Sequence, residues 1–163
     1  SMLDTRLEAR DQQVPANSPL LTAPQRTLLG PTQEEWLYRQ FANSQARGAR
    51  WRIIGQQVMM AQVLGPDGSP FNPDQWDGYQ ASRNRLLQYL AQERVNNVVV
   101  LTGDIHSSWA SEISANPFAP GTALATRQAV EFVTTAITSP ALEDPAAAAA
   151  TAAGLRQTHP HIQ

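Results

Sequence analysis

The stretch Asn97-Val98-Val99-Val100-Leu101-Thr102-Gly103-Asp104-Ile105-His106 decides the fold predicted for this chain. Its apolar run, rich in β-branched valines, is typical of a buried strand. Two possible metal ligands, Asp104 and His106, follow Gly103, and ligands bind at the carboxyl ends of strands in open α/β sheets. If the backbone stays extended there, side chains two residues apart point the same way. We therefore expect Asp104 and His106 to form a corner of a metal site.

Helix and strand signals alternate on both sides of this strand. Pro31 and the glutamates after it are typical of a helix start. A β-branched run at 130–138 predicts a second buried strand. The segment 107–113 alternates with period two, so it is either a strand pairing back on its predecessor or a short helix. The other expected elements are a strand end at 2–6, a loop at 7–30, a helix at 31–47, a strand at 51–55 continued by 58–60, a loop at 65–77, and helices at 80–94 and 145–157. This alternation indicates the α/β class.

The composition fits one globular domain over residues 1–163, or one large piece of a longer domain. A net charge of -2 gives no reason to expect nucleic acid or an acidic membrane surface as a partner. No apolar run is long enough to span a bilayer. The chain begins in the middle of a predicted strand and closes soon after His161, so we expect it to be truncated at both ends.

Several other polar residues are candidates for the site. Asp4, at the tip of the first short strand, is either a second carboxylate at the same sheet edge or an ordinary surface partner of Arg6. Trp76 and Tyr79 are expected to be packed aromatics that pin a loop. Tyr79 and Asp4 are also candidates for substrate binding. Arg83, on the helix after Tyr79, is a candidate for binding an anionic substrate. Two histidines near the chain end, His159 and His161, are expected to be exposed and inert.

Asp104 and His106 also have a purely structural interpretation, in which the aspartate caps the strand end and the histidine is a satisfied, partly buried imidazole. The polar neighbours Thr102, Ser107 and Ser108 favour a site over a core at this tip. The sequence lacks a phosphate-binding loop, a dinucleotide fingerprint and a nucleophile elbow.

Several separate stretches together resemble one family, the PhoD-type alkaline phosphatases of the calcineurin-like metallophosphoesterase superfamily. Their order and spacing agree over nearly all of the chain, and this agreement is far more specific than any one stretch. The matching stretches are Leu3-Asp4-Thr5-Arg6, Gln33-Glu34-Glu35-Trp36-Leu37, Trp51-Arg52-Ile53-Ile54-Gly55-Gln56-Gln57-Val58-Met59, Trp76-Asp77-Gly78-Tyr79 with Arg83, Leu101-Thr102-Gly103-Asp104-Ile105-His106-Ser107-Ser108, Glu131-Phe132-Val133, Ser139-Pro140 and Pro160-His161-Ile162.

The resemblance implies a metallophosphatase fold, a β-sandwich with a mixed sheet flanked by helices, of which this chain is the carboxy-terminal part. It implies hydrolysis of phosphomonoesters or phosphodiesters at a metal cluster, with Asp104 and His106 among the metal ligands and His106 assisting the leaving group. Calcium and iron are the metals it implies, and export from the cytoplasm is the expected localisation. The partner would be a phosphate-ester substrate.

The resemblance also implies that most metal ligands lie in a preceding part of the family's chains. Cysteine is absent here, so the thiolate of the family's iron site cannot come from this chain. We therefore expect this chain alone to bind metal poorly and to be nearly inactive, and we expect self-association through uncovered strand edges. The alternative is a non-catalytic α/β module whose tip at Asp104 binds an ion or a partner.

Overall fold

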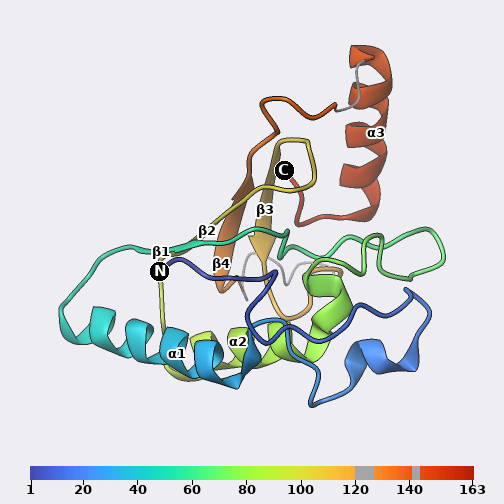
Figure 1. The fold of residues 1–163 in the computed structure, drawn as a ribbon. Helices are drawn as coiled ribbons and strands as arrows, with labels where there is room; N and C mark the ends of the chain where they lie inside the picture. Colours follow the sequence, from blue (N-terminus) through green and yellow to red (C-terminus); the bar gives the residue numbers. More distant parts are fainter. Residues whose placement is uncertain (120–126, 141–143) are drawn as a thin grey trace.

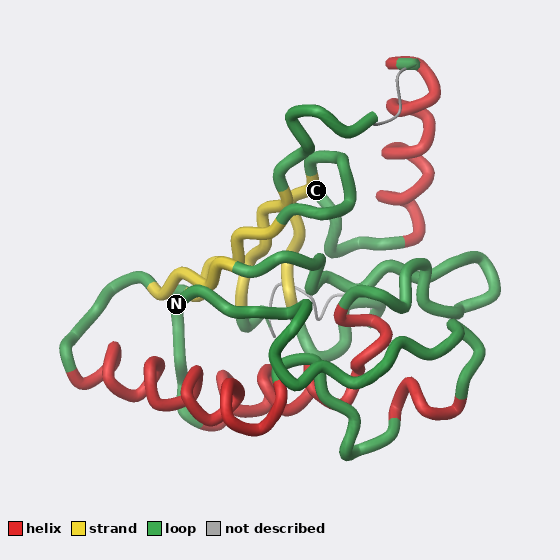
Figure 2. Tube along the Cα trace, in the orientation of Figure 1, coloured by secondary structure: helices red, strands yellow, loops and turns green. Residues whose placement is uncertain are grey.

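The fold is described from a computed structural model, which covers residues 1–119, 127–140 and 144–163. Its elements, in chain order, are η1 (Pro19–Thr22), α1 (Gly30–Ala46), β1 (Arg52–Gly55), η2 (Trp76–Tyr79), α2 (Gln80–Gln92), β2 (Val98–Thr102), β3 (Trp109–Ile113), β4 (Ala129–Val133) and α3 (Pro145–Thr158). Figures 1 and 2 show the strands at the centre, α1 and α2 together on one side of them, and α3 standing apart.

The four strands form one mixed sheet in the order β1-β2-β4-β3. β1 and β4 both run parallel to β2, so the quoted valine strand is central, whereas β3 is antiparallel to β4. The α/β class with a mixed sheet flanked by helices is therefore confirmed, and the described residues contribute one sheet. One expectation for 107–113 was a strand paired with the preceding strand, β2. The segment does contain a strand, β3, but its partner is β4, which lies between β3 and β2.

One face of the sheet carries the main core. Ile54, Val98 and Val100 point from the strands toward the helices and are almost fully buried. Leu37 of α1 and Leu87 of α2, both with no exposed surface, pack in the same cluster. The helical periodicity of these apolar residues is what places both amphipathic helices on this face.

The opposite face of the sheet is apolar and uncovered by any described helix. Ile53, Leu101 and Phe132 are 52%, 45% and 51% exposed, respectively. Leu101 and Phe132 are direct neighbours across β2 and β4. A contiguous exposed apolar surface of this kind marks a place where another part of a protein, or another protein, packs.

Both outer strands are partly covered by the ends of the chain. Met2 forms a parallel bridge with Gly55 of β1, and Ile162 forms an antiparallel bridge with Ser111 of β3. The expected strand end at 2–6 is therefore reduced to this bridge. Self-association through strand edges remains a prediction, but the structure places the larger apolar exposure on the sheet face.

Other boundaries differ from the sequence predictions. Residues 58–60 are not strand: Met60 donates its N–H to a side chain, the Glu131 carboxylate, at 2.8 Å. β4 ends at Val133 instead of continuing to 138. α3 begins at Pro145 as predicted, and the Asp144 side chain caps it by accepting from Ala146 N at 2.9 Å. No described helix has the length and apolarity needed to cross a membrane.

Candidate functional site at the strand tips

Three parallel strands deliver their carboxyl ends to one edge of the sheet. The register aligns Gly55 of β1 with Leu101 of β2, and Thr102 with Val133 of β4. The segments that follow these ends are bonded to one another. Gly103 N donates to Gln57 O at 3.4 Å, and Thr135 Oγ1 donates to His106 O at 3.1 Å. The loop with Asp104 and His106 is therefore held from both neighbouring strands.

The backbone of this tip is not extended. Asp104 has φ 76° and His106 has φ 57°, which places both in the left-handed region. Non-glycine residues rarely adopt this conformation, and such outliers cluster at functional sites. The assumption that an extended chain aligns the two side chains was therefore wrong, and the left-handed residues are the two candidates themselves, not Gly103. The proposed ligand roles of Asp104 and His106 stay predictions.

Arg6 joins the tip to a distant loop. Its guanidinium makes ion pairs with Asp104 and with Asp74, and Arg10 forms a second ion pair with Asp74. Burial alone would raise the pKa of Asp74, but the hydrogen bonds from Arg6 and Arg10 hold that pKa below its usual value. A cation therefore already faces the Asp104 carboxylate, and sequence reasoning missed it because these residues are 98 positions apart.

Asp4 has a local role in this arrangement. Its Oδ1 accepts backbone N–H groups from Arg6 and Leu7, both at 2.8 Å, and these bonds lower the pKa of Asp4. The carboxylate thus turns the chain so that the Arg6 side chain points at Asp104. The alternative of an Asp4–Arg6 ion pair is not seen among the described residues, where Arg6 pairs with Asp74 and Asp104 instead. Substrate binding by Asp4 stays a prediction.

Tyr79 and Arg83 lie in the interior. Tyr79 has no exposed surface, and its hydroxyl donates to Asp11 O and accepts from Arg10 Nε, both at 2.8 Å. Arg83 is 4% exposed and pairs with Asp77 at 3.1 Å. Burial raises the pKa of Asp77 to about 6, although Arg83 opposes that rise. The packing role expected for Tyr79 and Trp76 is confirmed, whereas substrate binding by Tyr79 or Arg83 stays a prediction.

The two terminal histidines are buried, so the expectation of an exposed, inert pair was wrong. His159 Nε2 accepts from Leu64 N at 3.0 Å, and His161 Nε2 bonds Gln62 O at 2.8 Å. Phe118 packs edge-on against both imidazole rings. Burial lowers the pKa of His161, so its neutral form is favoured.

These histidines belong to a larger arrangement that fixes the segment after β1. Buried side chains from remote positions bond successive backbone groups of residues 60–64. Glu131 accepts from Met60 and Ala61, His161 bonds Gln62, Asp77 accepts from Val63 and His159 accepts from Leu64. One backbone group of each residue in this segment is thus bonded by a buried side chain, and these bonds hold the segment in place beside the strand tips.

Glu131 is the least expected residue of this arrangement, because carboxylates are rarely buried within an apolar strand. It is a fully buried carboxylate in the middle of an apolar strand, and burial raises its pKa. The signal was present in Val130-Glu131-Phe132-Val133, because an acid within a buried run requires partners. The partners themselves could not be read from the sequence.

The donors present do not make a complete metal centre. Asp104 and His106 are the two candidate ligands, and the described residues contain no group of three or more His, Cys, Asp or Glu side chains placed to hold an ion. Asp104 is moreover paired with Arg6. The described part of this chain therefore supplies at most one side of a metal site.

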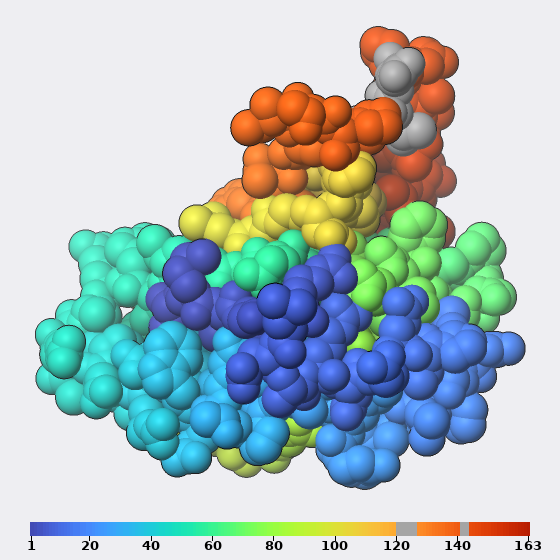
Figure 3. Space-filling model, in the orientation of Figure 1, coloured from blue at the N-terminus to red at the C-terminus, as the bar shows by residue number. Residues whose placement is uncertain are grey.

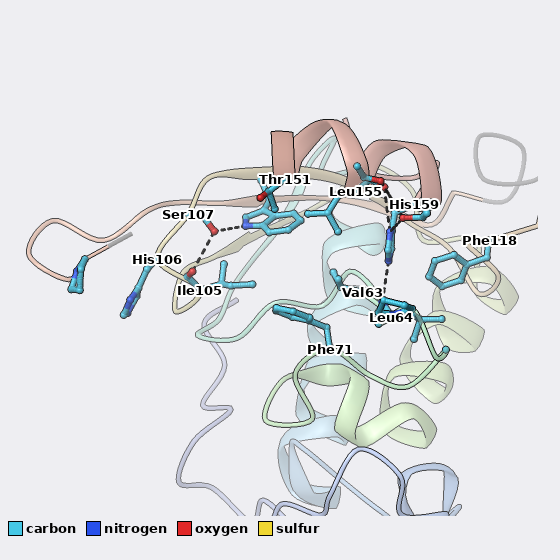
Figure 4. A pocket seen from close by; sticks show the side chains of 17 residues that line it. Val63, Leu64, Phe71, Ile105, His106, Ser107, Phe118, Thr151, Leu155 and His159 are labelled. Carbon is cyan, nitrogen blue, oxygen red and sulfur yellow. Dashed lines mark hydrogen bonds between the residues drawn. The ribbon is translucent and has the colours of Figure 1, made fainter. Parts of the chain in front are cut away.

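A cavity of about 940 Å³ opens beside His106, between α3 and the loop that carries Val63 and Phe71. Figure 4 shows His106 at one end of this cavity and His159 with Phe118 at the other. The space-filling view shows α3 rising above the body of the molecule (Figure 3).

Comparison with known proteins gave matches of three kinds: a family model, a curated relative and a solved structure. A family model described as PhoD-like phosphatase matches residues 1–163. Alkaline phosphatase D of Bacillus subtilis (strain 168) is 39% identical over 146 residues, which are 85% of this chain and 24% of that protein. A solved structure described as "Structure of PhoD" aligns with a TM-score of 0.83 and 34% identity, over 99% of this chain and 31% of that one. The chain thus spans about a quarter to a third of the length of these relatives.

Proposed function

The chain belongs to the PhoD-like phosphatase family, and from this membership we propose that it takes part in phosphate-ester hydrolysis within a longer protein, as its relatives' length suggests. Phosphomonoesters and phosphodiesters are the proposed substrates. The observation that carries the proposal is the strand tip, where the left-handed residues Asp104 and His106 lie at the carboxyl ends of parallel strands with Arg6 beside them.

We assign a separate role to each side chain at the tip. Arg6 presents a guanidinium, the group best suited to bind two phosphoryl oxygens at once. His106 is exposed, and the described structure records no hydrogen bond of its imidazole, so this ring is free to donate a proton to the departing alkoxide oxygen. Asp104 offers the hard oxygen ligand that a cation such as calcium prefers.

Metal ions, when bound, would lower the pKa of a water molecule and neutralise charge on the phosphoryl group. Calcium and iron are the ions that the family resemblance suggests. Because the described residues of this chain supply at most Asp104 and His106, the other ligands would have to come from elsewhere in a longer protein. For the same reason we propose that this chain alone is nearly inactive. Export from the cytoplasm is likewise proposed from the resemblance.

The test is an assay of the longer protein and of this chain with 4-nitrophenyl phosphate and bis(4-nitrophenyl) phosphate. We expect metal-dependent turnover by the longer protein, loss of turnover in His106→Ala with unchanged folding, and little turnover by this chain. Turnover by this chain that Asp104→Ala abolishes would contradict the proposed division of the site. Turnover of neither ester by the longer protein would contradict the enzyme assignment.

One observation favours a second function. Asp104 is already neutralised by Arg6, which is the arrangement expected of a structural strand end in a non-catalytic module that binds an ion or partner. In that case, His106→Ala and Arg6→Ala would leave any activity of the longer protein unchanged.

A further inference from the structure

The cavity beside His106 has walls from segments that are distant in sequence. The loop at 63–71 forms one side, α3 forms another with Leu155, and Ile105 and Trp109 complete the lining. Its volume of about 940 Å³ lies within the range of small-molecule sites, roughly 300–1,000 Å³. It is large enough for an aromatic or alkyl group of drug-like size.

Several polar atoms of the wall are already paired with one another. Trp109 Nε1 donates to Ser107 Oγ at 2.6 Å, and His159 Nε2 accepts from Leu64 N at 3.0 Å. The Thr158 hydroxyl lies 2.8 Å from His159 Nδ1. No arginine, aspartate or glutamate is among the described lining residues. Away from His106, the wall therefore presents mainly carbon atoms to the contents of the cavity and provides no site for a phosphate or another anion.

The end of the cavity at His106 is different. This imidazole is exposed and free of recorded hydrogen bonds among the described residues, and it belongs to the loop whose Asp104 pairs with Arg6. A ligand seated along the cavity would thus have its apolar part against Phe71, Trp109 and Leu155, and would end at the proposed phosphate site.

We propose that this cavity binds the uncharged, apolar organic group of the phosphate ester, with the phosphate at the His106 end. The inference rests on the proposed function and adds the substrate class: esters of aryl or long-chain alcohols are preferred over esters of small polar alcohols. Selectivity comes from removing apolar surface from water, which a small hydroxylated alcohol does not supply.

The binding test uses this chain and an uncharged probe, 2-naphthol, in isothermal titration. We expect saturable binding that is weakened about tenfold in Phe71→Ser and in Leu155→Ser, because an apolar group of the wall is lost. The matched control is Leu20→Ser, since Leu20 is 52% exposed, Phe71 is 65% exposed, and Leu20 lies outside the cavity. Absence of saturable binding, or equal binding by Phe71→Ser and the control, would overturn the inference and leave the proposed function untouched.

The kinetic test uses the longer protein with 2-naphthyl phosphate and glycerol phosphate. We expect the ratio of the kcat/KM for 2-naphthyl phosphate to that for glycerol phosphate to fall about tenfold in Phe71→Ser and to stay at the wild-type value in the control Leu20→Ser. Comparing ratios between variants cancels the different reactivity of the two esters. An unchanged ratio would overturn the inference. Hydrolysis of neither ester, with naphthol binding intact in this chain, would instead overturn the proposed function and with it the assignment of the cavity to a substrate.

Discussion

Thr102 Oγ1 donates a 2.6 Å hydrogen bond to the fully buried carboxylate of Glu131, which joins the central strand β2 to its neighbour β4. The network continues outward, because Gln56 Nε2 donates to Thr102 Oγ1 and Trp76 Nε1 donates to Gln56 Oε1. The same carboxylate accepts two backbone N–H groups of the segment after β1. A single buried acid therefore links the sheet to the segment that borders the strand tips.

The first prediction concerns the pH dependence of stability through Glu131. Burial raises the pKa of this group in the folded state. A raised pKa means that its contribution to stability is present below the pKa of the unfolded chain and is lost as pH rises through the folded pKa. Relative to Glu131→Gln, the wild type should therefore gain stability as pH falls, by up to about 1.4 kcal/mol per pH unit. Urea unfolding of both proteins at pH 5 and pH 8 measures this difference.

The matched control for that experiment is Glu8→Gln, because Glu8 is exposed. It should track the wild type at both pH values. A Glu131→Gln effect of the same size at pH 5 and pH 8 would contradict the prediction.

The second prediction concerns the buried ion pair of Arg83 and Asp77. In Arg83→Met the Asp77 carboxylate stays buried without its cation, so we expect a loss of about 3–5 kcal/mol at pH 8. Burial already raises the pKa of Asp77 to about 6, and removing Arg83 removes the charge that opposes this rise. The loss should therefore shrink at pH 5, where Asp77 takes up a proton. Thermal and urea unfolding at both pH values test this.

The double variant Arg83→Met with Asp77→Asn serves as the control for that pair. It keeps an acceptor for Val63 N, which bonds Asp77 at 2.8 Å, and it removes the charge. We expect it to be more stable than Arg83→Met at pH 8 and to keep only the pH dependence that other groups, such as Glu131, contribute. If Arg83→Met lost the same free energy of unfolding at pH 5 and at pH 8, burial of the Asp77 charge would not be the cause.

The third prediction separates a catalytic from a structural role of Arg6. Its side chain is 33% exposed, so its ion pairs should stabilise the fold by less than about 1 kcal/mol. If Arg6 binds the phosphoryl group, Arg6→Ala should lower kcat/KM of the longer protein about 10- to 100-fold, the range expected for charge-assisted hydrogen bonds. Arg39→Ala is the control, since Arg39 also makes a surface ion pair, with Glu35. Equal kinetics of the two variants would refute the role of Arg6.

Local sequence was sufficient for most elements of the fold. The β-branched runs around Val99 and Val130 predicted β2 and β4, helical spacing predicted α1 and α2, and an alanine-rich composition predicted α3. The order of the strands could not be predicted in this way, because β4 inserts between β2 and β3 through pairings that no local pattern encodes. The segment 58–60 has the composition of a strand, but the N–H of Met60 is taken by the Glu131 carboxylate.

The sequence predicted where the candidate site lies better than it predicted the geometry of that site. An apolar strand followed by Gly103-Asp104 correctly indicated a polar sheet edge, as the topology requires. The left-handed backbone and the pairing with Arg6 depend on contacts across the fold, so spacing alone did not reveal them. His159 was expected to be exposed because of its nearness to the chain end, yet α3 returns it to the interior beside Leu64.

The fourth prediction concerns the uncovered face of the sheet. Leu101 and Phe132 are neighbours in register there, and each leaves about half of its side chain in water. Burying such a pair against a second copy is favourable, since apolar surface contributes about 25 cal/mol per Å² removed from water. We expect this chain to self-associate with rising concentration. The double variant Leu101→Thr with Phe132→Thr should weaken association at least tenfold, because threonine suits a strand but offers less apolar surface.

Sedimentation velocity over a range of concentrations measures that association. The control is Ile137→Thr, because Ile137 is fully exposed and lies outside the strands. Association that persists unchanged in the double variant, or that weakens equally in the control, would place the contact elsewhere. A wild-type chain that stays monomeric at every concentration would show that this apolar face is too small to hold two copies together. In a longer protein whose remaining residues cover the face, the same double variant should instead lower the free energy of unfolding, because the two side chains would be buried there.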